Sequence, residues 1–362
     1  MDISAPPEAD LEGVLALARP EIRALTPYSH AQWLPALERL HANELPWQVD
    51  GPVQIGALNR YPEPQPQALL DAIATLYGTA PPQILVGRGS DEAIDLLTRA
   101  FCRAGQDAIV ITPPTFGMYA VAARIQGARV VEVPLDARQD FALDRAALLQ
   151  AVDASVKLVF LCSPNNPTGT AMPNADILQI AAALKNRALV VVDEAYQEFS
   201  PNASLVPQIA QHANLVVLRT LSKAHGLAGA RIGSLIARPG VVALLRRIIP
   251  PYALAQPTVV VALAALSAPS LALTRERIKL LIAERERLAA ALTPLPCVQR
   301  VWPSAGNFLL VRFVDARRAF DAIAKVGLLV RDFSSQPALA QALRITIGSP
   351  AQNDRIVEAL RS

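Results

Sequence analysis

The chain has 362 residues, of which 52% are hydrophobic and 18% charged, and its formal net charge is +3 at pH 7. Its basic side chains are scattered, which argues against a nucleic-acid surface, and no apolar run reaches the ~18 residues of a membrane span. Three widely spaced cysteines and four histidines without ligand spacing exclude a disulfide framework and a common metal site. These features predict a metal-independent globular enzyme of the cytoplasm.

The N-terminal residues 1–60 are predicted to form an irregular arm, because prolines recur throughout this part of the chain. A short helical piece is expected around Leu34, Leu37 and Leu40. The first residues have neither a basic segment nor a long apolar run, so no secretory signal is expected. A rigid turn at residues 59–64 then presents Tyr61.

Residues 68–240 alternate short apolar runs with segments of helix length, which predicts a mostly parallel, seven-stranded sheet between helices. The runs lie near residues 84–86, 108–112, 129–133, 156–161, 188–192, 215–218 and 232–236. Ligands of such sheets bind at the carboxyl ends of the strands. Residues 89–91 and 163–169, Asp193 and Lys223 all lie at such ends, so we expect a ligand site there.

After residue 251 the pattern changes to that of a smaller α+β domain. Strands are expected at 308–313, 327–332 and 342–347, with a helix over 316–326. A long helix before them has an apolar face formed by Ile278, Leu281, Ile282, Leu288 and Leu292. The predicted division is an arm and part of the small domain over 1–50, a large domain over 51–255 and a small domain over 256–362.

The side chains that could take part in catalysis or ligand binding occur in a definite order along the chain. Asn166 lies in the turn-forming sequence Ser-Pro-Asn-Asn-Pro-Thr-Gly, Asp193 closes an apolar run with Tyr196 three residues later, and Arg231 follows Lys223 by eight residues. A lone lysine at a strand end is usually solvated, and a lone aspartate there usually caps a helix. Together, these residues resemble the site of pyridoxal-phosphate enzymes of fold type I. The chain is most similar to the histidinol-phosphate aminotransferase family.

The resemblance implies that pyridoxal 5′-phosphate is the cofactor and that Lys223 bonds to it covalently. A partly desolvated lysine near other cations suits this role, because it is more readily neutral, and it can then move the proton of the substrate α-carbon. Asp193 would keep the cofactor's pyridine nitrogen protonated, so that the ring can accept electrons. Tyr196 and Asn166 would hydrogen-bond the phenolic oxygen. Phe116 would stack on the ring, at a position where the family usually has tyrosine.

The cofactor phosphate is expected at the start of a helix, where free N–H groups and the helix dipole favour a dianion. The residues expected to bind it are Ser90 and Asp91 at that helix start, the hydroxyl side chains Thr220 and Ser222, and Arg231. In the family, a tyrosine of the neighbouring subunit also reaches this phosphate, and Tyr61 matches it. The resemblance therefore implies a homodimer with shared active sites.

The resemblance to the histidinol-phosphate aminotransferase family rests on residues 19–28, 42–44, 330–333 and 343–348. Arg331 and Arg344 match the family's arginines that meet the phosphate of histidinol phosphate or the carboxylate of glutamate. Tyr28 and Asn43 would help to close the same pocket. Leu45 departs from the family pattern, which has an asparagine there.

The reaction implied is transfer of the amino group of L-glutamate to imidazole-acetol phosphate, giving L-histidinol phosphate and 2-oxoglutarate in histidine biosynthesis. An aromatic amino-acid aminotransferase and a threonine-phosphate decarboxylase are the enzymatic alternatives. The non-enzymatic alternative is the aminotransferase-like half of a transcription regulator, but the proline-rich arm leaves no room for a DNA-binding domain.

Overall fold

The computed structural model describes residues 8–27, 42–45, 47 and 58–361. Within this part of the chain, the larger sheet has the strand order β1-β7-β6-β5-β4-β2-β3. Its strands are β1 (Ile84–Gly87), β2 (Ala108–Ile111), β3 (Arg129–Glu132), β4 (Val156–Cys162), β5 (Leu189–Asp193), β6 (Leu215–Thr220) and β7 (Gly233–Ile236). All neighbours are parallel except β7, which is antiparallel to both β6 and β1. The predicted mostly parallel, seven-stranded sheet is confirmed.

The central strands read as continuous apolar runs because each face of the sheet is covered by helices. Along β5, Leu189 and Val191 join one buried cluster, whereas Val190 and Val192 join another on the opposite face. The covering helices are α3 (Gln67–Tyr77), α4 (Ser90–Phe101), α5 (Met118–Gln126), α6 (Arg145–Ala151), α7 (Asn174–Ala183) and α8 (Pro239–Leu245). Helices α4, α5 and α8 contribute to the first cluster, and α6 and α7 to the second.

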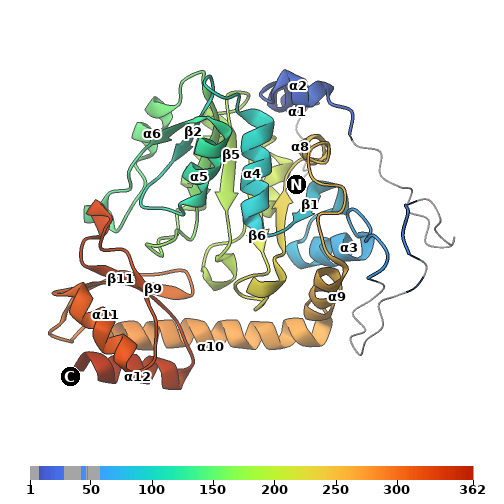
Figure 1. Ribbon diagram of the computed structural model, residues 1–362. Coiled ribbons are helices and arrows are strands. Elements are labelled where there is room, and N and C mark those ends of the chain that lie inside the picture. Colours follow the sequence, from blue (N-terminus) through green and yellow to red (C-terminus); the bar gives the residue numbers. More distant parts are fainter. Residues whose placement is uncertain (1–7, 28–41, 46, 48–57, 362) are drawn as a thin grey trace, which may run out of the picture.

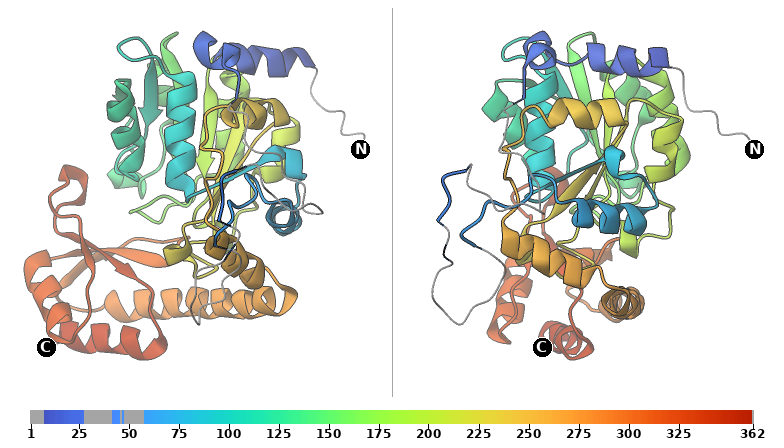
Figure 2. Two further views of the ribbon diagram at one scale, coloured as in Figure 1. Left: turned by 45° about the vertical axis from the view of Figure 1, so that its right-hand side comes forward. Right: turned by 90° about the vertical axis from the view of Figure 1, so that its right-hand side faces the viewer.

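The C-terminal part forms a second, smaller layer built on an antiparallel sheet of order β10-β11-β9-β8. Its elements are α9 (Gln256–Ala265), α10 (Ala268–Leu292), β8 (Val298–Val301), β9 (Phe308–Phe313), α11 (Ala316–Lys325), β10 (Arg331–Asp332), β11 (Ala342–Thr346) and α12 (Pro350–Arg361). Figure 1 shows α10, in orange, running below the larger sheet from α9 to the small sheet, and Figure 2 shows the same arrangement from two other sides.

The prediction of an irregular arm with one short helix around Leu34 is wrong at the start of the arm, where α1 (Glu8–Ala16) and α2 (Pro20–Ala24) are helical. Proline at the first position of α2 supports the helix start rather than breaking it, because a backbone N–H at that position would have no partner within the helix, so the missing N–H of proline costs nothing. Helix α1 is held by tertiary packing, in which Leu11 lies against Gly240 of α8. The short helix expected around Leu34 lies outside the described residues.

In the small domain, one strand prediction is wrong in its bounds and one strand was not predicted. The strand expected at 327–332 shortens to Arg331–Asp332, because Gly327 has a left-handed φ of 74° and the N–H of Leu328 bonds back to Ile323 of α11. Strand β8 was not predicted, since its outward residues Gln299 and Arg300 conceal the apolar pattern.

The remaining ordered pieces are short 3-10 turns: η1 (Pro81–Gln83), η2 (Ala137–Gln139), η3 (Gln197–Phe199), η4 (Val206–Ala210), η5 (Ala228–Ala230) and η6 (Pro337–Leu339). No single helix in the described residues is long and apolar enough to cross a membrane; α9 and α10, bent by 70°, pass a length and composition test only as a pair. The described residues contain no cluster of metal-ligating side chains.

Candidate active site

The carboxyl ends of the central strands open into a cavity of about 610 Å³ between the large sheet and the small domain. The predicted site residues that line it are Ser90, Asp91, Phe116, Asn166, Asp193, Tyr196, Thr220, Ser222, Lys223, Arg231, Arg331 and Arg344. They come from segments more than 250 residues apart in the chain, from the start of α4 to β11. The folded chain therefore brings these predicted residues together in one place.

A buried carboxylate forms the floor of the cavity. Asp193, the last residue of β5, is only 3% exposed. Its Oδ2 accepts a hydrogen bond of 2.8 Å from the hydroxyl of Tyr119, and its Oδ1 accepts one of 3.1 Å from the Ala195 N–H. Burial raises the pKa of Asp193 to about 6, although these two donors oppose the rise. A cation placed against this carboxylate would favour its ionised form.

Lys223 approaches the same cavity from the loop that follows β6. Its Nζ lies 5.5 Å from the centre of the Tyr196 ring. Burial and then the Arg344 cation lower the pKa of Lys223, while the negative charge of Asp193 acts in the opposite direction. A lowered pKa increases the fraction of neutral amine, which is the nucleophilic form.

One end of the cavity is formed by the first turn of α4. Gly89, with a φ of 90°, precedes Ser90, and a Cβ on Gly233 would lie only 2.3 Å from the backbone of Gly89 and Ser90. This close approach sets the helix start against β7. The first N–H groups of a helix have no partner within the helix, so they suit an anion. Arg231 lies beside them, and its Nη2 is 3.2 Å from Asp91 Oδ2.

Hydroxyl groups from the end of β6 face the same turn. Thr220 Oγ1 donates a hydrogen bond of 2.9 Å to Ser222 Oγ, and both side chains line the cavity with Ser90. Helix N–H groups, hydroxyls and a guanidinium thus converge at one end, which is a donor set that fits a phosphate.

The opposite side of the cavity carries two guanidinium groups from the small domain. Arg331 of β10 and Arg344 of β11 are directly paired in the register of the antiparallel ladder. The Arg344 guanidinium lies 5.4 Å from the ring centres of both Phe308 and Phe333 and donates a hydrogen bond to Asn166 Oδ1. Neither arginine pairs with a carboxylate in the described part of the chain, so both charges are available to an anion in the cavity.

Two predicted residues among those that the structure describes do not line this cavity. Tyr61 and Asn43 line a separate cavity of about 540 Å³, and Tyr61 is 49% exposed with its ring stacked 4.5 Å from that of Tyr252. Tyr28 lies outside the described residues. The structure therefore keeps Tyr61 and Asn43 away from the Lys223 of their own chain.

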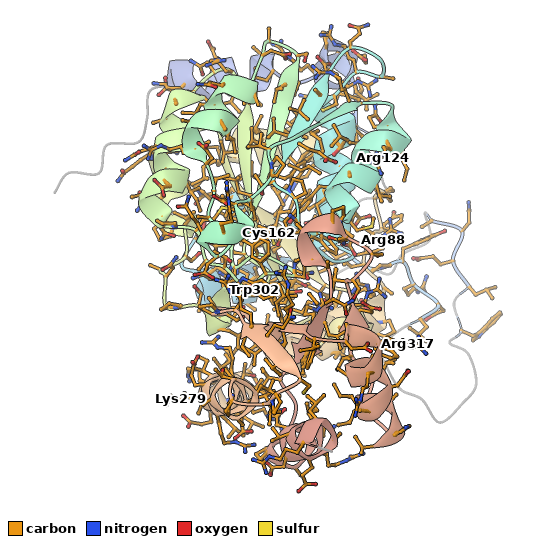
Figure 3. All side chains as sticks on the ribbon, turned by 90° about the vertical axis from the view of Figure 1, so that its left-hand side faces the viewer. Arg88, Arg124, Cys162, Lys279, Trp302 and Arg317 are labelled. Atoms are coloured by element: carbon orange, nitrogen blue, oxygen red, sulfur yellow. The ribbon has the colours of Figure 1, made fainter. Side chains whose placement is uncertain are left out.

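Two features of the site were not predicted from the sequence. Cys162, at the carboxyl end of β4, also lines the cavity. Figure 3 labels it at the end of the larger sheet that faces the small domain. Tyr119, on α5, is fully buried and reaches Asp193 from the helix layer. Its signal was weak, because a tyrosine on an apolar helix face is usually an ordinary core residue.

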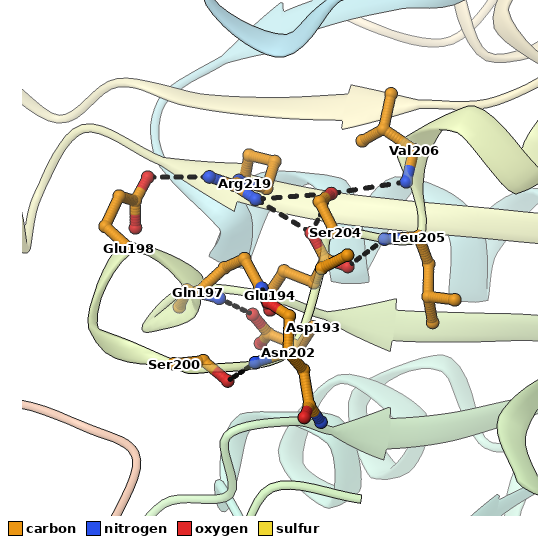
Figure 4. Close-up of polar contacts among 12 residues, drawn as sticks. Asp193, Glu194, Gln197, Glu198, Ser200, Asn202, Ser204, Leu205, Val206 and Arg219 are labelled. Atoms are coloured by element: carbon orange, nitrogen blue, oxygen red, sulfur yellow. Dashed lines mark hydrogen bonds and ion pairs between the residues drawn. The ribbon is translucent and has the colours of Figure 1, made fainter. Parts of the chain in front are cut away.

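A buried ionic cluster at the ends of β5 and β6 is centred on Arg219, as Figure 4 shows. Arg219 of β6 is 5% exposed, and its guanidinium lies 2.8 Å from Glu194 Oε2 and 2.7 Å from Glu198 Oε1. Because side chains alternate along a strand, Glu194 and Arg219 point away from the face that carries Asp193 and Thr220. The ion pairs join β6, which precedes the loop of Lys223, to the segment that directly follows Asp193 of β5. Alternation along these strands would have allowed the cluster to be predicted.

The cavity as a whole fits pyridoxal 5′-phosphate. A phosphate-binding end, a lysine with a lowered pKa and a buried carboxylate are arranged around one space, and Phe116 provides an aromatic surface beside it. This donor set supplies a partner for the phosphate, the aldehyde and the pyridine nitrogen of that cofactor.

Comparison with known proteins identifies the class. Residues 43–360 match the family model of aminotransferase class I and II, and the chain belongs to this family, whose cofactor is pyridoxal 5′-phosphate. Within this family, the chain is 52% identical over 356 residues to the histidinol-phosphate aminotransferase of Stenotrophomonas maltophilia, and the alignment covers 97% of this chain and 98% of that one. It is 53% identical over 354 residues to the histidinol-phosphate aminotransferase of Xanthomonas campestris, covering 96% and 97%.

A solved structure of a histidinol-phosphate aminotransferase also has a fold similar to that of this chain. The histidinol-phosphate aminotransferase of Sinorhizobium meliloti in complex with pyridoxal-5′-phosphate superposes with a TM-score of 0.76 at 29% identity, covering 85% of this chain and 83% of that one. The predicted resemblance and the predicted fold type I architecture are confirmed.

Proposed function

We propose that the protein is a histidinol-phosphate aminotransferase, transferring the amino group of L-glutamate to imidazole-acetol phosphate to give L-histidinol phosphate and 2-oxoglutarate. The observation that carries this proposal is the pair of guanidiniums, Arg331 and Arg344, on the cavity that also holds Lys223 and Asp193. A substrate with an anionic tail requires such cations within reach of the amine chemistry. The curated relatives that share about half of their residues with this chain have the same named activity.

When bound, the cofactor would supply an aldehyde that accepts the amino group and a ring that takes up the electron pair released at the substrate α-carbon. Lys223 Nζ would hold it covalently, and Asp193 would hold the proton on its pyridine nitrogen. The neutral Nζ of Lys223 would also act as the base that removes the proton of the substrate α-carbon. The lowered pKa of Lys223 supports both roles, since each requires a neutral amine.

The remaining lining residues would orient the two reactants. Ser90, Asp91 and Arg231, with the hydroxyls of Thr220 and Ser222, would bind the cofactor phosphate. Phe116 would pack on the ring, and Tyr196 and Asn166 would hydrogen-bond its phenolic oxygen. Because Arg344 also donates to Asn166, the binding of the substrate tail would be coupled to the orientation of the ring.

We further propose a homodimer with shared active sites. Tyr61 is exposed and lines a different cavity from its own Lys223, which suits a residue that reaches the phosphate of the partner subunit. Asn43, in the same cavity as Tyr61, and Tyr28 would help to close the pocket over the substrate. The cytoplasmic location and the domain boundaries remain predictions.

The test is a comparison of amino donors on the cofactor-loaded protein. Histidinol phosphate and L-glutamate should each convert the cofactor rapidly to its amine form, which changes its absorbance, whereas L-phenylalanine should react slowly. Faster reaction with phenylalanine would favour an aromatic amino-acid aminotransferase. Carbon dioxide release from threonine phosphate would indicate the decarboxylase, and no spectral change with any donor would favour the regulator.

A further inference from the structure

We propose that Tyr119 is a positioning residue of the amino-transfer reaction, whose hydroxyl orients the Asp193 carboxylate and keeps it ionised opposite the pyridine nitrogen of the cofactor. The inference rests on the proposed function only through cofactor binding, and it does not depend on which amino donor the enzyme prefers. Tyr119 does not line the cavity, so it would act through Asp193.

The Tyr119 hydroxyl is held in place by the packing of its ring. The side chain is fully buried, and its ring stacks on that of Phe160, with centres 4.8 Å apart and an angle of 10° between the planes. Phe116 contacts it edge-on at 5.7 Å and 83°. A ring packed between two aromatic neighbours has little rotational freedom. The direction of the O–H group toward Asp193 is therefore a fixed property of the fold.

The Asp193 carboxylate is oriented by two donors from different elements. Tyr119 of α5 donates to Oδ2 at 2.8 Å, and the Ala195 N–H of the chain after β5 donates to Oδ1 at 3.1 Å. Each carboxylate oxygen can accept two hydrogen bonds, so both retain a site for a pyridinium N–H. Among the described residues, Tyr119 is the only side chain that donates to this carboxylate.

The charge of Asp193 depends on that donor because the site is buried. The titratable groups around it, from every neighbouring element, are Asp91 of α4, Tyr119 of α5, Cys162 of β4, Tyr196 after β5 and Lys223 after β6. Burial raises the pKa of Asp193, and the Tyr119 hydrogen bond lowers it. Burial and the nearby Asp193 charge raise the pKa of Tyr119 well above its ordinary value, so the phenol remains a donor at every working pH.

Removal of the hydroxyl should move a proton within the site. A hydrogen bond to a charged group stabilises that charge, so its loss favours the neutral acid form of Asp193 by about 10- to 100-fold. The proton then resides on the carboxyl group instead of the pyridine nitrogen. A neutral pyridine is a weaker electron acceptor, so kcat should fall by a similar factor, while KM for the amino donor should change little.

The experiment is ¹⁵N NMR of the holoenzyme loaded with cofactor labelled at the pyridine nitrogen, without substrate. In Tyr119→Phe, which keeps the stacked ring, the resonance should move from the protonated toward the unprotonated value. The control is Tyr77→Phe, a partly buried tyrosine of α3 that does not line the cavity and whose hydroxyl has no hydrogen-bond partner in the described residues; it should leave the resonance in place. An unmoved resonance in Tyr119→Phe would overturn the proposal.

A double variant covers the case in which Tyr119→Phe does not fold. Adding Asp193→Asn removes the buried charge, so the double variant should fold, and its kcat should equal that of Asp193→Asn alone. A double variant that still fails to fold, or that loses further activity, would show that Tyr119 does not act through Asp193. Failure of the wild type to bind the cofactor would instead contradict the proposed function.

Discussion

The two arginines of the small domain should make unequal contributions to substrate binding. Arg344 is partly buried near Phe308 and Phe333 and donates a hydrogen bond to Asn166, whereas Arg331 is exposed and its guanidinium lies 6.0 Å from the centre of the Phe333 ring. Replacing Arg344 by lysine keeps the charge but removes the planar fork that grips two oxygens and stacks on the rings. We expect a loss of roughly 2–4 kcal/mol of transition-state stabilisation, measured as the decrease in kcat/KM, which is the range for a disrupted, desolvated charge pair.

The same loss should appear with L-glutamate and with histidinol phosphate, the amino donor of the reverse reaction, because each brings an anionic tail. Arg331→Ala should cost only about fivefold with histidinol phosphate, since an exposed charge is screened by water. L-Phenylalanine has no distal anion, so Arg331→Ala should leave its kcat/KM unchanged. The assay is kcat/KM for the three donors with wild type and both variants.

A matched control separates substrate binding from packing. Arg312 of β9 also stacks on an aromatic ring, with its guanidinium 5.0 Å from the centre of Trp302, but it does not line the cavity. Arg312→Lys should therefore alter stability without changing donor preference. The reasoning fails if Arg344→Lys reduces the reaction of phenylalanine as strongly as that of histidinol phosphate, and the role of Arg331 fails if its variant lowers all donors equally.

Three other perturbations have expected outcomes. Asp193→Asn should lower kcat by several orders of magnitude. The same variant should stabilise the cofactor-free protein above pH 6 by up to ~3 kcal/mol. The reason is that the pKa of Asp193 is about 6 in the folded protein and 3.8 ordinarily, so the wild type loses stability as the pH rises from 3.8 to 6. Unfolding in urea at pH 4 and pH 8 checks this, and equal stability of variant and wild type at pH 8 would contradict it. Arg219→Met should destabilise the fold by ~3–5 kcal/mol, because it leaves two buried carboxylates without a cation. Burial opposes the ionisation of Glu198, but the Arg219 cation outweighs burial and lowers the pKa of Glu198. The stabilisation by this ion pair is therefore present above the ordinary glutamate pKa of 4.5 and is lost as the pH falls through the lowered pKa. An Arg219→Met variant within about 1 kcal/mol of the wild-type stability would show that the cluster is dispensable. Mixing Tyr61→Phe with Lys223→Ala subunits should raise activity above either parent, since a mixed dimer has one site with neither defect; no rise after confirmed subunit exchange would place Tyr61 outside the partner's site.

The larger sheet could be predicted because its strands are buried on both faces and read as uninterrupted apolar runs such as residues 189–192. The elements that were missed obtain their stability from elsewhere in the fold. Helix α1 has almost no amphipathic pattern and is held by contacts with α8, and β8 is half-exposed. The local pattern of apolar and polar residues in the sequence does not indicate such tertiary contacts.

The site residues at strand ends could be predicted because a parallel sheet collects those ends at one edge. Tyr119 could not, since it belongs to a helix and its distance from Asp193 depends on the strand order β5-β4-β2, which places α5 over the site. The convergence of Arg331 and Arg344 likewise depends on the register of β10 and β11, which two short segments do not reveal by their spacing.

The central claim is that Lys223 holds the cofactor and that histidinol phosphate, the product of the proposed reaction, is the amino donor of the reverse direction. Borohydride reduction of the cofactor-loaded protein, followed by peptide mapping, tests both parts at once. The label should lie on Lys223, and prior incubation with histidinol phosphate should prevent labelling, because the donor converts the cofactor to its noncovalent amine form. A label on Lys157 or Lys185, or labelling of Lys223 that persists after the donor is added, would contradict the account.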